Sequence, residues 1–158
     1  MSEDMTIAPA ALTRRGLLGL GAGAVLIATT PMRGMADEAD MHAAIKEAFG
    51  DRPIEDAGVS LKLPPISENG FSVPLTVSVD SPMTEADHIT QIALFSPRNP
   101  LPDLVRFKLG PRAGKAEIAT RIRLSGTQTL VAIAETNQGR LLRGTAETVV
   151  TLAACVVL

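Results

Sequence analysis

The sequence predicts an all-β sandwich that follows a leader segment and a short helix. From residue 58 onward apolar side chains recur at every second position, which is the period of a half-buried strand. Turn-forming residues interrupt these stretches at intervals of roughly 10–15 residues, giving about seven short strands, a spacing typical of sandwiches rather than βαβ units. The chain has 158 residues, 46% of them hydrophobic, which suits one domain with its own core.

The N-terminal segment predicts export through the twin-arginine route. Arg14 and Arg15 directly precede an apolar run of about 15 residues, and Gly34-Met35-Ala36 is a small-x-small cleavage site. The run is shorter than the ~20 residues that span a bilayer, which disfavours the alternative of an uncleaved membrane anchor. We therefore expect residues 1–36 to be a signal peptide cleaved after Ala36, and the mature protein to be periplasmic without a membrane span.

The next segment, residues 37–57, predicts a helix followed by a linker. Within residues 40–49 the apolar side chains recur at helical spacing, and Gly50 can end the helix as its C-terminal cap. The apolar positions are Met41, Ala44, Ile45, Ala48 and Phe49.

Residues 58–158 are predicted to form the sandwich. The expected strands cover residues 59–63, 73–79, 89–95, 104–109, 116–124, 130–134 and a last stretch from about residue 141 to the C-terminus. Residues 89–95 and 130–134 are apolar on both faces, as central strands are. Pro74 cannot donate to a ladder, so its strand is expected at a sheet edge or with a bulge.

Composition argues against two broad classes of function. Aromatic residues make up only 3% of the chain, with no Trp and no Tyr, and the net charge is -2, so platforms and basic surfaces for nucleic acid are missing. The chain has no Gly-rich phosphate loop, and its two histidines, His42 and His88, are far apart in sequence. A metal site from these histidines with carboxylates is the alternative to structural roles for both. We expect neither a resident cofactor nor a self-sufficient enzyme.

Arg121 and Arg123 lie two residues apart on a predicted strand and therefore share a face. A solvated face, with Glu117 as an ionic partner, is the structural interpretation. A patch that attracts an anion or a protein partner is the functional one.

Cys155 is the chain's single cysteine. A lone cysteine in an exported protein indicates either a reactive thiol or an intermolecular disulfide. A terminal thiol can carry a substrate covalently, since the thiolate is a nucleophile. The alternative is that residues 152–158 form a buried last strand in which Cys155 is a small hydrophobic residue.

An ordered set of motifs resembles the SoxY family, the sulfur carriers of the thiosulfate-oxidising Sox system. The set runs along the whole mature chain and comprises Glu68-Asn69-Gly70, Val73-Pro74-Leu75-Thr76-Val77, Asp80-Ser81-Pro82-Met83-Thr84, Asp87-His88-Ile89, Leu94-Phe95, Asn99-Pro100, Thr120-Arg121-Ile122-Arg123-Leu124, Thr127-Gln128, Val131-Ala132-Ile133-Ala134-Glu135, Val150-Thr151-Leu152 and Cys155.

The resemblance implies an immunoglobulin-like β-sandwich that forms a heterodimer with a SoxZ-like sandwich subunit. It also implies that Cys155 holds thiosulfate-derived sulfur covalently, that other Sox enzymes act on this adduct, and that the carrier itself has no cofactor. The family's arm is Gly-Gly-Cys-Gly-Gly, whereas this chain has Ala153-Ala154-Cys155-Val156-Val157. Valine is stiff and favours strands, so this tail is predicted to be bulkier and readier to pair. A non-carrier interaction module with a structural tail is therefore the alternative function.

Overall fold

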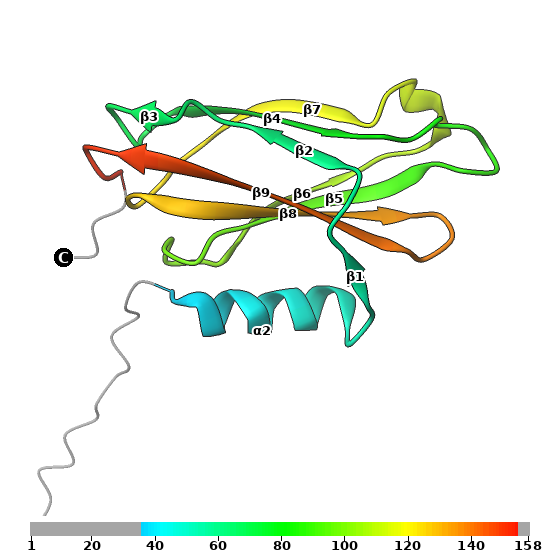
Figure 1. Ribbon diagram of the computed structural model, residues 1–158, viewed down its shortest axis with the longest axis horizontal. Helices are drawn as coiled ribbons and strands as arrows, with labels where there is room; N and C mark the ends of the chain where they lie inside the picture. The colour runs from blue at the N-terminus through cyan, green and yellow to red at the C-terminus, as the bar shows by residue number, and fades with distance from the viewer. Residues whose placement is uncertain (1–35, 155–158) are drawn as a thin grey trace, which may run out of the picture. The chain divides into compact units, whose positions relative to one another are not determined.

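The computed structural model describes residues 36–154, which form one helix and two β-sheets (Figure 1). The predicted leader, up to residue 35, and Cys155 with the residues after it lie outside the described range. The elements in chain order are α2 (Glu38–Phe49), β1 (Ile54–Glu55), β2 (Val59–Lys62), β3 (Ile66–Ser67), β4 (Val73–Val79), β5 (Ile89–Phe95), β6 (Asp103–Lys108), the 3-10 turn η1 (Pro111–Ala113), β7 (Glu117–Ile122), β8 (Gln128–Thr136) and β9 (Leu141–Val150).

The two sheets confirm the predicted all-β sandwich. The larger sheet has the strand order β1-β9-β8-β5-β6, with β3 also paired to β9, and the smaller has the order β2-β4-β7. Strands β5 and β8 are central in the larger sheet, as their doubly apolar sequences predict. The sheets face each other across a core of aliphatic side chains, in which Leu75, Leu94 and Leu130 are almost fully buried.

The prediction that Pro74 marks an edge or bulged strand is wrong. β4 is the central strand of the smaller sheet and runs in regular register with β7, where Pro74 lies opposite Arg121. Strand β2 pairs only with the part of β4 from Thr76 to Val79. The Val79 N–H donates to the Ala116 carbonyl, on the β7 side of β4. Backbone N–H groups point to opposite sides at successive residues of a strand, so the nitrogen of Pro74, five residues earlier, faces the β2 side. Pro74 lies past the end of β2, where no ladder donor is needed.

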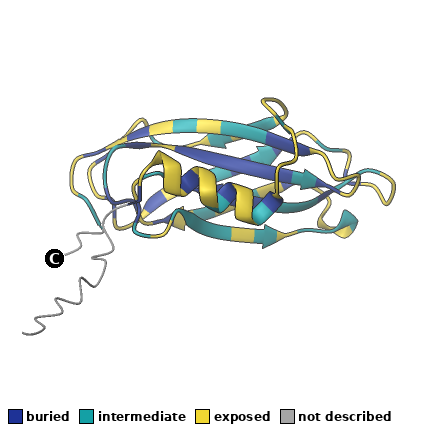
Figure 2. Ribbon diagram, turned by 90° about the horizontal axis from the view of Figure 1, so that it is seen from below, coloured by how far each residue is buried: buried dark blue, intermediate teal, exposed yellow. Residues whose placement is uncertain are grey.

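Helix α2 covers the outer face of the larger sheet. Asp37 and Asp40 form a capping box at its start, and Gly50, with a φ of 73°, ends it while donating its N–H to the Lys46 carbonyl. The buried face of the helix packs on β5, β8 and β9, and its exposed face points to solvent (Figure 2). The rings of Phe49 and Phe95 meet edge to face with centroids 6.2 Å apart.

The segment predicted as a linker also contributes to the sheet. Ile54 and Glu55 form β1, which pairs in parallel with Leu141 and Leu142 at the start of β9. The N-terminal helix is thereby joined to the sandwich by a strand as well as by its apolar face. Within residues 36–154, no helix is both long and apolar enough to cross a bilayer.

Candidate functional site

The candidate site is the point at which the chain leaves the sandwich on its way to Cys155. Strand β9 ends at Val150, and Thr151 is then fixed to the segment that follows β3. The Thr151 N–H donates to the Ser67 carbonyl at 3.0 Å, and its hydroxyl donates to the Glu68 carbonyl at 2.8 Å. The first residue after β9 is therefore held by two hydrogen bonds to residues 67 and 68.

Three backbone hydrogen bonds then hold the chain up to the residue before Cys155. The Gly70 N–H donates to the Leu152 carbonyl at 2.8 Å, and the Leu124 N–H donates to the Gly70 carbonyl at 2.9 Å. The Ala154 N–H donates to the Leu124 carbonyl at 3.0 Å. We call this arrangement of Gly70, Leu124, Leu152 and Ala154 the clamp. It joins the β3–β4 connection, the end of the β7 segment and the tail.

Only glycine fits at position 70 of the clamp. A β-carbon added there would lie 2.3 Å from the Leu124 carbonyl oxygen, 3.0 Å from the Ala154 nitrogen and 3.1 Å from the Leu152 carbonyl oxygen. The first of these atoms is rigid backbone and cannot move without breaking the clamp. The motif Glu68-Asn69-Gly70, which the sequence identifies only as part of the family resemblance, thus positions the tail.

The turn around Gly70 is held by its own side chains. The Phe71 N–H donates to the Asn69 side-chain oxygen at 2.7 Å, and the Ser67 hydroxyl donates to the Asn69 carbonyl at 3.0 Å. Such side-chain hydrogen bonds fix the local backbone in an Asx-type turn. The clamp therefore has a preformed side that does not depend on the tail.

The Leu124 side of the clamp rests on a buried polar network. Asn99, which is only 5% exposed, donates from its amide to the Arg123 carbonyl at 2.7 Å and accepts from the Ser125 N–H at 3.0 Å. The Gln128 amide also donates to the Asn99 oxygen, at 3.3 Å, while its own oxygen accepts from Ser96. Within residues 36–154 no buried side-chain nitrogen or oxygen lacks a partner. The network fixes the segment that presents the Leu124 carbonyl.

The predicted carrier residue, Cys155, lies outside the described residues, and the structure does not test its role. In the sequence Cys155 directly follows Ala154, the last clamped residue. For residues 152–154 the alternative of a buried last strand is wrong, because β9 ends at Val150 and Leu152 is 58% exposed.

Arg121 and Arg123 are both exposed, as the shared strand face predicts, and they line an open groove. The groove has a volume of about 450 Å³ and lies between β6 and β7, the edge strands of the two sheets. Arg121 donates to the Ser72 hydroxyl at 3.1 Å, and among the described residues no ion pair joins Glu117 to either arginine. The predicted partnership with Glu117 is wrong.

The two histidines have separate surroundings. His42 is an exposed residue of α2. The His88 ring nitrogen Nδ1 lies 3.0 Å from the Thr84 carbonyl oxygen, and the His88 backbone N–H donates to the Asn137 side-chain oxygen. Across the described part of the chain, no group of three or more His, Cys, Asp and Glu side chains is arranged to hold a metal ion.

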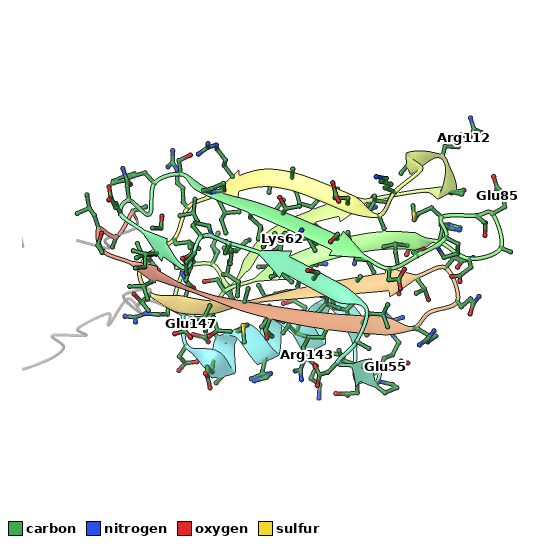
Figure 3. All side chains as sticks on the ribbon, turned by 45° about the horizontal axis from the view of Figure 1, so that its top comes forward. Glu55, Lys62, Glu85, Arg112, Arg143 and Glu147 are labelled. Atoms are coloured by element: carbon green, nitrogen blue, oxygen red, sulfur yellow. The ribbon has the colours of Figure 1, made fainter. Side chains whose placement is uncertain are left out.

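Two ion pairs tie the β1 segment to β9 at the other side of the fold. Arg140 donates to Glu55 at 2.7 Å, and Arg143 donates to Asp56 at 2.7 Å with a second, shorter contact (Figure 3 labels Glu55 and Arg143). The hydrogen bonds from the guanidinium groups lower the pKa of both carboxyls and raise the pKa of both arginines. These pairs are structural and lie apart from the clamp.

Comparison with known proteins relates this arrangement to sulfur carriers. Residues 45–155 match the family model described as sulfur oxidation protein SoxY, so the match reaches Cys155. The solved structure of the sulfur carrier protein SoxY from Chlorobium limicola f thiosulfatophilum is 34% identical, with a TM-score of 0.61, and the alignment covers 72% of this chain and 98% of that one. The comparison with curated proteins finds no match.

Superoxide reductases share the fold alone. The enzyme (neelaredoxin) from Ignicoccus hospitalis is 22% identical, with a TM-score of 0.53, over 73% of this chain and 94% of its own. This likeness supports the immunoglobulin-like sandwich predicted from the resemblance and carries no argument about chemistry. By the extent of the family match and by the identity to a solved member, the chain belongs to the SoxY family of sulfur oxidation proteins.

Proposed function

We propose that this protein is a periplasmic carrier that holds thiosulfate-derived sulfur covalently on Cys155 and presents it to other enzymes of the Sox system. Family membership supports the sulfur carrier role in general. The observation that carries the specific proposal is the extent of the family match, which includes Cys155, the residue directly after the clamped Ala154.

Loading joins the Cys155 thiol to the terminal sulfur of thiosulfate. A sulfur–sulfur bond forms, and the reaction of the thiol with the thiosulfate dianion releases one proton, from the thiol, and two electrons. The chain offers no cofactor in this proposal, so an oxidising enzyme of the Sox system must accept the electrons. The thiol attacks as the thiolate, and an unperturbed cysteine is thiolate to only a few per cent near neutral pH.

The proposal includes the protein's location and its partner subunit. Arg14 and Arg15 with the apolar run after them support export through the twin-arginine route, and Gly34-Met35-Ala36 supports cleavage after Ala36. The family implies partnership with Sox proteins, and we propose a SoxZ-like β-sandwich subunit as the partner in a heterodimer.

The experiment is loading of the purified mature protein followed by intact-mass measurement. Incubation with thiosulfate and the Sox oxidising enzymes is expected to add one thiosulfate-derived group to the wild type and none to Cys155→Ser. Treatment with a reductant is expected to remove the group, since it is held by a disulfide-type bond. A wild-type mass that does not change, with active enzymes present, contradicts the proposal.

A second candidate, the non-carrier interaction module, is favoured by the clamp when it is taken together with the tail sequence. The backbone is held directly before Cys155, and Val156-Val157-Leu158 follow it. In this case a small thiol reagent labels Cys155 slowly in the native protein and quickly after unfolding. Rapid labelling of the native protein supports the carrier instead.

A further inference from the structure

The exposed large apolar side chains of the described fold gather around the root of the tail. Within residues 36–154 five large hydrophobic residues are exposed, and four of them lie on the segments joined to the tail, which are β3, the β3–β4 connection, the end of β9 and the tail itself. We call these four the collar, and they are Ile66 at 63% exposed, Phe71 at 50%, Val149 at 42% and Leu152 at 58%.

The backbone brings the collar residues together from three parts of the chain. Ile66 of β3 lies directly opposite Val149 of β9 in the parallel pairing of these strands. Phe71 follows Gly70, whose N–H is bonded to the carbonyl of Leu152. The collar therefore flanks the same hydrogen bonds that hold the tail.

The collar differs from an ordinary protein surface because its exposed large apolar side chains lie close together. Single exposed apolar residues are common on soluble proteins, whereas a gathering of large ones marks an interaction site. The neighbours Ser67 and Val150 in the same β3–β9 pairing are buried, so these two strands turn one side chain inward and the next outward. The outward positions are apolar although the core does not use them.

The short distance from the clamp to Cys155 indicates which kind of protein binds to the collar. With Ala154 bonded to Leu124, the Cys155 sulfur lies within roughly 7 Å of the Ala154 Cα, because one Cα–Cα step and one side chain separate them. A protein whose reactive centre reaches that sulfur must bring the rim of its cleft onto the surface around Leu152. This surface is the collar.

We propose that the collar is the docking surface for the enzymes that react with the Cys155 thiol, each presenting an apolar rim around the cleft that receives it. The inference rests on the proposed carrier function. It adds to that function a recognition element formed by the folded domain together with the first residues of the tail. Buried apolar contacts at the centre of an interface dominate its binding energy, so single charges in the collar weaken docking strongly.

The test uses Ile66→Glu and Leu152→Glu in the full mature chain with its SoxZ-like partner. Ala113→Glu is the matched control, because it adds the same charge at an exposed position next to Arg112, at the end of the sandwich opposite the collar (Figure 3). Leu152→Ser and Ile66→Thr replace the glutamate variants if either of these fails to fold.

Two rates are measured for each variant. The first is labelling of Cys155 by a small thiol reagent, which needs no docking and is expected to stay within about twofold of the wild type in every variant. The second is enzyme-catalysed adduct formation at low carrier concentration, which is expected to fall by about tenfold or more in the collar variants and to stay unchanged in Ala113→Glu.

Adduct formation at the wild-type rate in both collar variants overturns the inference and leaves the carrier function intact. Loss of the SoxZ-like subunit from the collar variants also overturns it, because the surface is then the interface between the two subunits. A wild-type protein that forms no adduct overturns the carrier function itself, and the docking surface with it.

Discussion

Gly70 and Leu124 lie so close together that the Leu124 carbonyl oxygen occupies the space of a β-carbon at position 70, 2.3 Å from where that atom would be. The Leu124 N–H donates to the Gly70 carbonyl, and the Leu124 carbonyl accepts from Ala154. At Leu124 the sandwich thereby holds the chain leading to Cys155 through backbone groups, so these two hydrogen bonds do not use the Leu124 side chain.

Gly70→Ala is expected to break the clamp. The added methyl group forces Leu124 away, so two or three backbone hydrogen bonds are lost and the free energy of unfolding falls by about 1–3 kcal/mol. Hydrogen exchange at the Ala154 amide is expected to become faster. Gly110→Ala is the control, since a β-carbon there has no heavy atom within 4 Å and the φ of Gly110 is -145°. Equal hydrogen exchange in the two variants would contradict the clamp.

Asn99→Ala is expected to loosen the support behind Leu124. The buried amide bonds Arg123, Ser125 and Gln128 at once, so its removal leaves buried polar groups without partners and lowers the free energy of unfolding by about 1–3 kcal/mol. Denaturant unfolding measures the loss. Gln138→Ala, at an exposed position in the β8–β9 turn, is expected to change stability by less than about 0.5 kcal/mol.

Phe49→Ala is expected to detach the helix from the larger sheet. Phe49 is 4% exposed and contacts Phe95 edge to face, so truncation removes an aromatic pair and leaves a cavity, at a cost of about 3–5 kcal/mol. Glu47→Ala tests the same helix without the core contact, because Glu47 is exposed. Similar thermal stability of the two variants would mean that the helix does not contribute to the core.

The ion pairs of β1 with β9 predict a loss of stability in acid. The pKa values of Glu55 and Asp56 are lowered in the folded protein from ordinary values of 4.5 and 3.8, because Arg140 and Arg143 donate to them. A carboxyl with a lowered folded pKa contributes stability above its unfolded pKa, and this contribution disappears as the pH falls through the folded pKa. We therefore expect stability to decline below about pH 4.5.

The double variant Glu55→Gln, Asp56→Asn measures this contribution. Its free energy of unfolding is expected to depend less steeply on pH in the acid range than that of the wild type, with little difference at very low pH, where both proteins lack the charges. Denaturant unfolding at a series of pH values provides the measurement. Identical acid slopes would show that both pairs are fully screened by solvent.

Local sequence patterns predicted a strand well where it buries alternate residues, as β4 does, because the alternation is then visible in the sequence itself. The centrality of β5 and β8 followed from their apolar character on both faces. The prediction for Pro74 is wrong because a proline lacks a ladder donor on one side of its strand only. Strand β2 is too short to reach Pro74, so no neighbouring strand needs a donor there. The sequence of β4 does not show where β2 ends.

The clamp and the collar escaped sequence analysis for a different reason. Gly70, Leu124 and Ala154 come from distant segments, and their contact uses backbone groups that every residue has. The exposure of Ile66 and Val149 is likewise a tertiary property, since the same residues in a closed sheet would be core. The one signal present was the motif Glu68-Asn69-Gly70, whose glycine has a packing role beyond the turn.

Strand β9 leads directly into the tail, and its pairing determines how the domain bears a pull on that tail. It is matched to β8 from Leu141–Glu135 through Thr148–Gln128, and β1 and β3 are paired to its other edge. The antiparallel ladder bonds between β8 and β9 run perpendicular to the strands. Tension along the tail therefore loads these bonds together in shear instead of peeling them one by one, so a pull on the tail is shared along the length of β9.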